Sequence, residues 1–256
     1  MASEVLLIEH LDDATTRLTL NRPDRRNALS IELMEVLSAE FALLATQSNR
    51  RVVILRGAGP AFCAGLDLNE AAQPELAERS AQGVARLFET IATSPLITIA
   101  AAQGAAYAGG AGLLACCDFV IASDDLKIAF PEVRRGLVPA LVAVLLRDRL
   151  SDSHTRELLL IAEPVAVDRA RAMGLVQQVV VTTELDTAAC ALALTVLKGM
   201  PQSVRSTKQL LHELRSPDFS QQLAHALEFH KRARSNSEAT AGVSAFLNRR
   251  GSDAPE

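Results

Sequence analysis

Short apolar segments alternate with helix-like segments along the first 181 residues of the chain. Runs of four to eight apolar and β-branched residues, bounded by turn residues, are typical of buried strands. Residues 5–11 and 16–20 form two such runs close together, which predicts a strand pair. Further strands are predicted at 51–55, 96–101, 118–123, 126–130 and 176–181.

Two longer segments between these strands show helical spacing. In 30–45 the apolar residues recur every three or four positions, which predicts one buried helix face. These residues are Ile31, Leu33, Met34, Leu37, Phe41 and Leu44. Ser30 precedes them and is a suitable N-cap. Residues 74–92 form a second predicted helix, which begins with a proline, where the missing N–H does no harm.

After residue 181 the pattern predicts helices alone, in 184–200, 201–216, 219–235 and 238–250. We therefore predict an α/β core over 1–195 and a helical region over 196–256. Apolar positions on the last helices need a partner, either the core or another subunit. These positions are Leu223, Leu227, Phe246 and Leu247.

Composition narrows the class of protein. Apolar residues make up 49% of the chain, enough for a large core, and the net charge is −4 with one Tyr and no Trp. This argues against a nucleic-acid-binding protein, which usually has a basic surface. The four cysteines form no C-x-x-C pair, and the N-terminus is acidic, unlike a signal peptide. We expect a cytoplasmic protein.

The five histidines show no metal-ligand spacing, and we expect no metal. His225 and His230 are predicted to be solvated on a surface helix. The adjacent pair Cys116 and Cys117 is predicted to lie in the core as small apolar residues.

The segment 96–117 contains 22 residues without a charge, enough to span a bilayer. It also contains four glycines and Gln103, and no Lys or Arg flanks it closely. A buried strand followed by a tightly packed helix is the preferred interpretation.

The same segment also satisfies a dinucleotide-binding motif. Gly110, Gly112 and Ala115 match G-x-G-x-x-[G/A], and Glu132 follows Gly112 by twenty residues. In that fold, however, the glycines follow a strand directly and the acid ends a second strand. Here 103–108 intervene, and Glu132 follows a proline.

A second glycine-rich turn, AGPAFCAGLDL (58–68), follows the predicted strand 51–55. Small residues allow backbone N–H groups to approach one point closely. Together with an N–H from the start of the Gly/Ala helix, this turn could form an oxyanion hole for an enolate. An ordinary strand-to-helix connection fits the spacing as well.

Three segments in this order, AFCAGLDL (61–68), AAQGAAYAGGAGLLACCDFVIAS (101–123) and FPEVRRGLVPA (130–140), carry a resemblance. They resemble the enoyl-CoA hydratase/isomerase (crotonase) superfamily. NRPDRRNALS (21–30), AMGLVQQVV (172–180) and EATAGVSAFLNRR (238–250) extend the likeness over nearly the whole chain.

The resemblance implies a spiral of repeated β-β-α units with a C-terminal helical region that builds trimers, often paired into hexamers. It implies an acyl thioester of coenzyme A as substrate, with no permanently bound cofactor. The backbone N–H groups of Ala64 and Gly109 would hold the thioester oxygen. The positions implied along the CoA ester are Arg26, Ala28, Asp67, Leu68, Tyr107 and Pro131.

The acid–base residues distinguish this chain within the superfamily. Hydratases of the family commonly carry two glutamates; the second matches Glu132, whereas the first falls on Gly112. One glutamate suits the shift of a double bond by a 3-enoyl to 2-enoyl-CoA isomerase, and it can also serve hydration. Asp118 falls at a position that is structural in the family.

A glycine at the first position resembles bacterial methylglutaconyl-CoA and related branched-chain hydratases. In that case Arg134 or Arg135 would meet a substrate carboxylate. We predict hydration of a 2-enoyl-CoA, with isomerisation as the alternative. Thioester hydrolysis, decarboxylation, a non-catalytic acyl-CoA binder and a dinucleotide-binding oxidoreductase stay open at this point.

Overall fold

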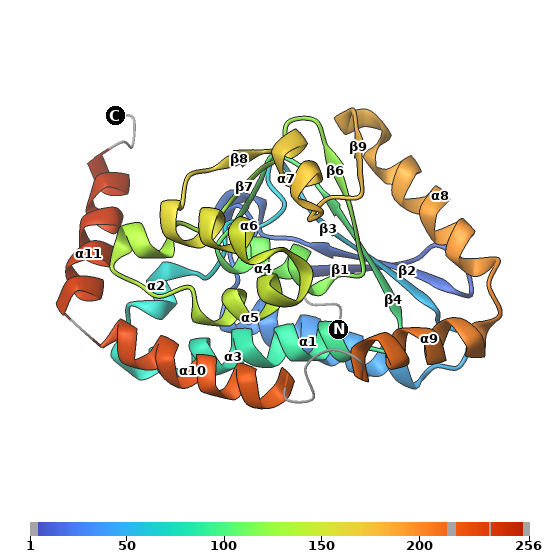
Figure 1. Ribbon diagram of the computed structural model, residues 1–256, viewed down its shortest axis with the longest axis horizontal. Coiled ribbons are helices and arrows are strands. Elements are labelled where there is room, and N and C mark those ends of the chain that lie inside the picture. The colour runs from blue at the N-terminus through green and yellow to red at the C-terminus, as the bar shows by residue number, and fades with distance from the viewer. Residues whose placement is uncertain (1–4, 214–218, 236, 253–256) are drawn as a thin grey trace.

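The computed structural model describes residues 5–213, 219–235 and 237–252 (Figure 1). Its main sheet has six strands in the order β1-β2-β3-β4-β6-β9, with β1 and β2 antiparallel and all other neighbours parallel. The strands are β1 (Leu6–His10), β2 (Thr15–Leu20), β3 (Val52–Gly57), β4 (Ile97–Ala102), β6 (Phe119–Ser123) and β9 (Gln178–Val180). The strands predicted in these regions are thereby confirmed.

A second sheet of three short strands lies in the order β5-β7-β8. Strand β7 (Lys127–Ala129) was predicted, whereas β5 (Ala105–Tyr107) and β8 (Val165–Ala166) were not. Both are too short to show a periodic pattern. Pairing with β7, parallel for β5 and antiparallel for β8, makes them strands.

The predicted helices form where the pattern placed them, and residues 214–216 of the predicted helix 201–216 lie outside the described residues. Helix α1 (Ile31–Thr46) buries the six predicted apolar positions, and the Ser30 hydroxyl accepts a hydrogen bond from the Leu33 N–H at 3.2 Å. Helix α3 (Pro74–Thr93) begins at the predicted proline. The other helices are α2 (Leu68–Ala71), α4 (Gly109–Cys116), α5 (Ala140–Arg149), α6 (Asp152–Arg156), α7 (Val167–Met173), α8 (Leu185–Leu197), α9 (Pro201–Glu213), α10 (Phe219–Arg234) and α11 (Ser237–Ser252).

Both faces of the central strands of the main sheet are buried, whereas the edge strand β1 exposes four of its five residues. Val53 and Leu55 of β3 join the larger core with α1, α3, α4 and α5, whereas Val52 and Ile54 pack under α8 on the other face. Helices α1, α3 and α10 form the layer below the sheet in Figure 1, and α8 lies at its other side. Burial on both faces explains why these parallel strands are continuously apolar in sequence.

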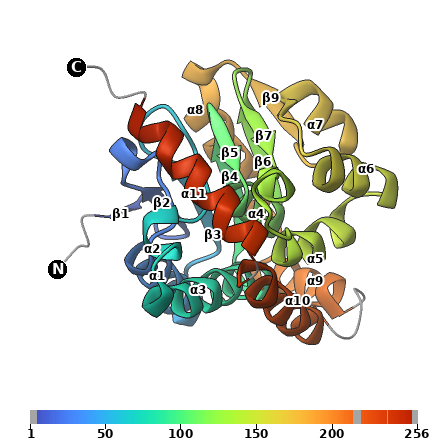
Figure 2. The same ribbon diagram turned by 90° about the vertical axis from the view of Figure 1, so that its left-hand side faces the viewer.

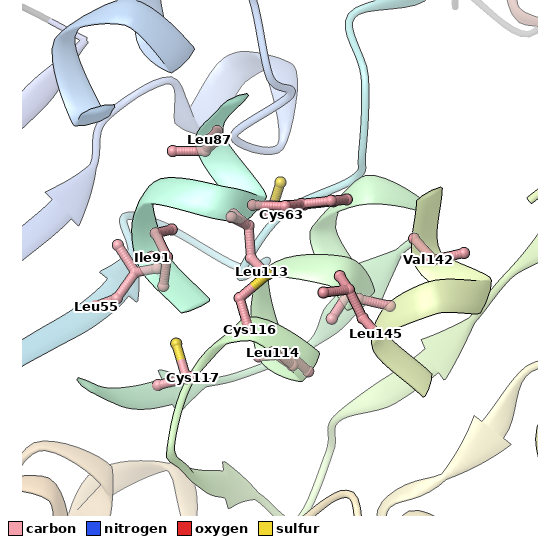
Figure 3. Packing of buried hydrophobic residues seen from close by; sticks show 14 of the residues in the cluster. Leu55, Cys63, Leu87, Ile91, Leu113, Leu114, Cys116, Cys117, Val142 and Leu145 are labelled. Carbon is pink, nitrogen blue, oxygen red and sulfur yellow. The ribbon is translucent and has the colours of Figure 1, made fainter. Parts of the chain in front are cut away.

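The Gly/Ala segment forms helix α4, packed between α3 and α5. Figure 3 shows Leu113 of α4 near Leu87 and Ile91 of α3, with Val142 and Leu145 of α5 on its other side. In the described part of the chain, no helix is long and apolar enough to cross a membrane. Cys116 and Cys117 are buried, as predicted.

The absence of side chains lets α4 approach the glycine-rich turn. A Cβ on Gly110 would lie 2.1 Å from the Cys63 carbonyl oxygen, closer than any real contact. Glycine is therefore required here for the close approach of two backbones. This contact brings together 61–68 and 101–123, two of the segments that resemble the superfamily.

The last two helices pack against the same chain. Helix α10 contacts α3 and α5, and α11 contacts the short 3-10 helix Pro131–Arg135. Figure 2 shows α11 crossing the front of the molecule and meeting α10 at its lower end. Leu223 is buried, Leu227 is half-buried against the core, and the side chain of Phe246 lies outside the described ones. The boundary between 195 and 196 and the trimeric or hexameric assembly stay predictions.

Candidate active site

A cavity of about 590 Å³ opens where the 61–68 turn, the start of α4 and the Pro131–Arg135 helix meet. Eight of the nine predicted site residues line it, namely Arg26, Ala28, Ala64, Asp67, Leu68, Tyr107, Gly109 and Glu132. Pro131 is not among the lining residues; it begins the short helix that carries Glu132. The fold therefore gathers residues from four separate segments at one place.

Backbone hydrogen bonds hold the two motif segments together at the cavity wall. The Cys63 N–H donates to the Ala105 carbonyl at 3.0 Å, and the Tyr107 N–H donates to the Cys63 carbonyl at 3.0 Å. A Cβ on Gly109 would lie 3.7 Å from the Leu66 backbone nitrogen. The turn and the start of α4 thus converge as the oxyanion-hole hypothesis requires.

The structure corrects the predicted role of Ala64. Its N–H donates to the Arg26 carbonyl at 2.9 Å, so this donor is already occupied and does not face a ligand. Ala64 contributes to the cavity wall instead. Sequence reasoning placed the donor in the right turn but on the wrong residue, because it could not show which way each peptide points.

The backbone N–H of Leu66, two residues later, has the open orientation that the N–H of Ala64 lacks. The Leu29 N–H donates to the Gly65 carbonyl at 2.8 Å, and the Asp67 N–H donates to the Leu29 carbonyl at 3.0 Å. In this parallel pairing the N–H of Leu66 points away from Leu29. Among the described residues, the Leu66 N–H has no hydrogen-bond partner, and Leu66 lines the cavity.

Gly109 is the first residue of α4, so its N–H has no partner within the helix. Ala108 before it has φ 49° and ψ −120°, in the region that favours glycine. The Ala108 N–H donates to the Ala129 carbonyl of β7 at 2.8 Å, which holds this backbone in place. Such strain, worth about 1–3 kcal/mol, is concentrated at functional sites.

Glu132 is the acidic group whose environment is most perturbed. Its Oε2 is shielded from solvent and has no hydrogen-bond partner among the described residues. Burial raises the pKa of the carboxyl group from 4.5 to about 7, although a backbone hydrogen bond and nearby Arg135 act in the opposite direction. A carboxyl group of this pKa exchanges protons readily near neutral pH.

No side chain can be accommodated where the first family glutamate would stand. A Cβ on Gly112 would lie 2.4 Å from Phe88 Cζ and 3.0 Å from a methyl group of Val142. Both neighbours line the cavity and are buried. The position is therefore filled by apolar side chains, which line the same cavity as Glu132.

The other two carboxylates of the cavity lining are already engaged. Asp67 pairs with Arg22 at 2.9 Å and accepts a hydrogen bond from the Asn69 N–H, which caps α2. Asp24 is exposed and lies 3.5 Å from Arg25. Among the described lining residues, Glu132 is the remaining candidate for proton transfer.

The structure distinguishes the two arginines that follow Glu132. Arg134 points outward, where it pairs with Glu163 and donates to the Ile161 carbonyl. Arg135 lines the cavity, and burial lowers the pKa of its guanidinium while Glu132 raises it. Of the two, Arg135 alone is placed to act on a ligand.

Sequence reasoning missed the contribution of the C-terminal helices. His230 and Arg234 of α10 and Leu247 of α11 all line the cavity. The prediction that His230 is solvated is wrong, since the residue is 8% exposed, whereas His225 is exposed as predicted. The spacing of the buried positions 223, 226 and 230 could have placed His230 on the inner face of the helix.

The family model described as "Enoyl-CoA hydratase/isomerase" matches residues 12–254. The chain belongs to the enoyl-CoA hydratase/isomerase family. It is 31% identical to a mevalonyl-coenzyme A hydratase of Aspergillus fumigatus over 245 residues, covering 91% of this chain and 88% of the relative. It is 29% identical to the 2,3-dehydroadipyl-CoA hydratase of Escherichia coli, covering 92% of this chain and 93% of that relative.

Solved structures of proteins with similar sequences support the same family assignment. The crystal structure of an enoyl-CoA hydratase from Mycobacterium avium superposes with a TM-score of 0.85 at 30% identity, covering 96% of this chain and 97% of the other. The predicted crotonase-type fold is thereby confirmed, and this hydratase/isomerase family member is an enzyme. The strand that follows α4 is β6, which ends at Ser123, and Glu132 lies beyond the next strand in a 3-10 helix, so the acid of the dinucleotide motif has no counterpart at the end of the second strand.

Proposed function

We propose that this enzyme hydrates a 2-enoyl-CoA thioester through an enolate, with Glu132 as the proton-transfer group. The observation that carries the proposal is the Glu132 carboxyl group, which lines the cavity with one oxygen shielded and unpaired. The naming of relatives as hydratases supports the same reaction. The acyl group would lie along the apolar wall formed by Val84, Phe88 and Val142.

Two backbone N–H groups would bind the thioester oxygen, those of Leu66 and Gly109. Both lie at the cavity wall, and neither has a hydrogen-bond partner within the described residues. As water adds to the double bond, negative charge develops on this oxygen. Preorganised donors aimed at such a charge typically contribute about 3–4 kcal/mol each to the barrier reduction.

Glu132 would carry one proton through the whole cycle. The ionised carboxylate accepts a proton from water as the water oxygen forms a bond to the β-carbon, which leaves an enolate. The resulting carboxylic acid then donates that proton to the α-carbon, and the carboxylate is restored. A pKa of about 7 suits both half-reactions.

The coenzyme A portion would lie at the other end of the cavity. Arg25 and Arg26 are exposed there and suit the phosphates, while Ala28 and Leu68 would contact the pantetheine chain. Asp67 would take part through its backbone, because its side chain is held by Arg22 and by α2. Tyr107 and Pro131 would position the turn and the helix beside the reacting atoms.

Isomerisation of a 3-enoyl-CoA is the second candidate. The observation that favours it is the filled space at Gly112, which leaves Glu132 as a single base. In that reaction Glu132 removes an α-proton and returns it at the γ-carbon, with no net uptake of water. A non-catalytic acyl-CoA binder would need the same cavity but would not need an uncompensated buried carboxyl group.

Labelled water distinguishes these reactions. The enzyme is incubated with 2-enoyl-, 3-enoyl- and 3-methylglutaconyl-CoA in heavy-oxygen water, and products are analysed by mass spectrometry. Incorporation of label indicates hydration, and movement of the double bond without label indicates isomerisation. Release of free CoA or carbon dioxide would indicate thioester hydrolysis or decarboxylation. Binding without turnover on all three esters would refute the proposal.

A further inference from the structure

One wall of the cavity carries two polar side chains that the proposed hydration does not use. His230 and Arg234 lie one turn apart on α10 and both line the cavity. The His230 ring is 8% exposed, and its Nε2 has no hydrogen-bond partner among the described residues. A buried polar atom without a partner is rare in folded proteins, and a bound water, an ion or a functional role is the usual explanation.

The His230 ring is held in a defined orientation. A hydrogen bond with the backbone of Val138, just before α5, favours the protonated ring, whereas burial and the charge of Arg234 lower the pKa of His230 to about 4. A bond that favours the charged ring is one that an N–H of the ring donates to a carbonyl. The shielded Nε2 is therefore left without a partner among the described residues, in a side chain that lines the cavity together with Arg234.

Arg234 lacks the counter-ion that a half-buried cation normally has. It donates to the Ala71 carbonyl at the end of α2, and no described carboxylate forms an ion pair with it. Burial lowers the pKa of its guanidinium, and no neighbouring acid offsets that effect. An anionic ligand group would supply the missing charge and accept the remaining N–H donors.

The cations of the cavity lining differ in exposure. Arg25 and Arg26 are exposed, whereas Arg135, beside Glu132, and Arg234, beside the enclosed His230, are half-buried. Arg135 already interacts with Glu132, so Arg234 is the half-buried cation to which an anion from the part of the ligand inside the cavity would bind. In an acyl-CoA that part is the acyl group.

We propose that His230 and Arg234 form a subsite for a carboxylate on the acyl group, so that the preferred substrate is an enoyl-CoA with a second, free carboxyl group. The carboxylate would accept hydrogen bonds from the Arg234 guanidinium. One proton, taken up from solvent as the ester binds, would be held between the second carboxylate oxygen and His230 Nε2 and completes the contact. This inference rests on the proposed hydration and names the substrate class of the same site.

The test compares two 2-enoyl-CoA esters of equal length, one ending in a carboxylate and the other in a methyl group. For each, kcat/KM for hydration is measured with the wild type, Arg234→Gln and His230→Phe. A hydrogen bond to a charged group corresponds to about a 10- to 100-fold effect. We expect the wild type to prefer the carboxylate ester by at least that factor and each variant to lose the preference.

The matched control is Arg232→Gln on the same helix, because Arg232 is exposed and stacks on Phe229 outside the cavity. This variant should keep the preference of the wild type. The ratio of kcat/KM for the two esters distinguishes loss of carboxylate binding from a general structural effect, since a loosened α10 would lower kcat/KM for both esters together.

Equal use of both esters by the wild type, or an unchanged ratio in both variants, would overturn the inference while leaving hydration standing. No hydration of either ester would instead refute the proposed function. If an Arg234 contact to the CoA phosphates were the true role, Arg234→Gln would raise KM equally for both esters and leave the ratio unchanged.

Discussion

Replacement of Glu132 by glutamine tests the catalytic and the electrostatic arguments together. Glutamine keeps the shape of the side chain but can neither accept nor deliver the proton. Positioned acid–base catalysis contributes about 10²- to 10⁴-fold, so we expect kcat to fall by at least 10²-fold. Because the ionised form of Glu132 starts the reaction, wild-type kcat/KM should rise with pH to half its maximum near pH 7, the pKa of the free enzyme.

The same substitution should make the protein more stable at alkaline pH. Since the pKa of Glu132 is raised from 4.5 to about 7, the folded chain holds a proton between these values that the unfolded chain releases. Wild-type stability therefore falls as pH rises through that window. Because protonation is linked to folding, the free energy of unfolding of the wild type should fall by about 2.5 kcal/mol between pH 5 and pH 8. The glutamine variant should show no such decrease.

Urea denaturation of both proteins at pH 5 and pH 8 measures this difference. The control is Glu163→Gln, which removes an exposed carboxylate of a surface ion pair and should change stability by less than about 0.5 kcal/mol at either pH. A stability difference between wild type and Glu132→Gln that stays the same at both pH values would refute the claim of a desolvated carboxyl group. Wild-type turnover in Glu132→Gln would refute its role in proton transfer.

Three other predictions concern packing and assembly. Gly112→Ala places a methyl group against Phe88, so chemical denaturation should show a loss of about 1–3 kcal/mol; full stability would contradict the close contact. Asp118 accepts hydrogen bonds from the Thr98 N–H and from Lys208, at 2.8 and 2.6 Å. Asp118→Ala should therefore cost about 2–4 kcal/mol while KM stays unchanged, and a raised KM would argue against a purely structural role. Light scattering should show three or six times the chain mass of 27.4 kDa; a value of 27 kDa would refute the predicted assembly.

The elements with long apolar patterns could be predicted from the sequence. Helix α1 shows this well, since its spacing identified all six buried positions and its N-cap serine. Strands β5 and β8 could not be found, because β5 lies within the Gly/Ala segment, whose small residues carry no strand pattern, and β8 has only two residues. Both become strands through pairing with β7.

The site was predictable in part, through motifs rather than through periodicity. Glu132 and Gly109 were identified by their positions in those motifs, and both line the cavity. Ala64 was chosen over Leu66, because the direction of a peptide N–H depends on which strand the turn pairs with. His230 was taken for a surface residue, since charged neighbours in sequence concealed its burial against the start of α5.

The sequence by itself determined the strands of the main sheet, the long helices, the small residues of 104–118 and the single matched glutamate. Local apolar spacing and side-chain size carry that information directly. Only the tertiary structure decided that Phe88 and Val142 fill the space beside Gly112, that Leu66 rather than Ala64 has an open N–H, and that α10 closes the cavity. These features arise where segments far apart in the chain come into contact. The burial of these side chains and the direction of the Leu66 N–H therefore exist only in the folded state.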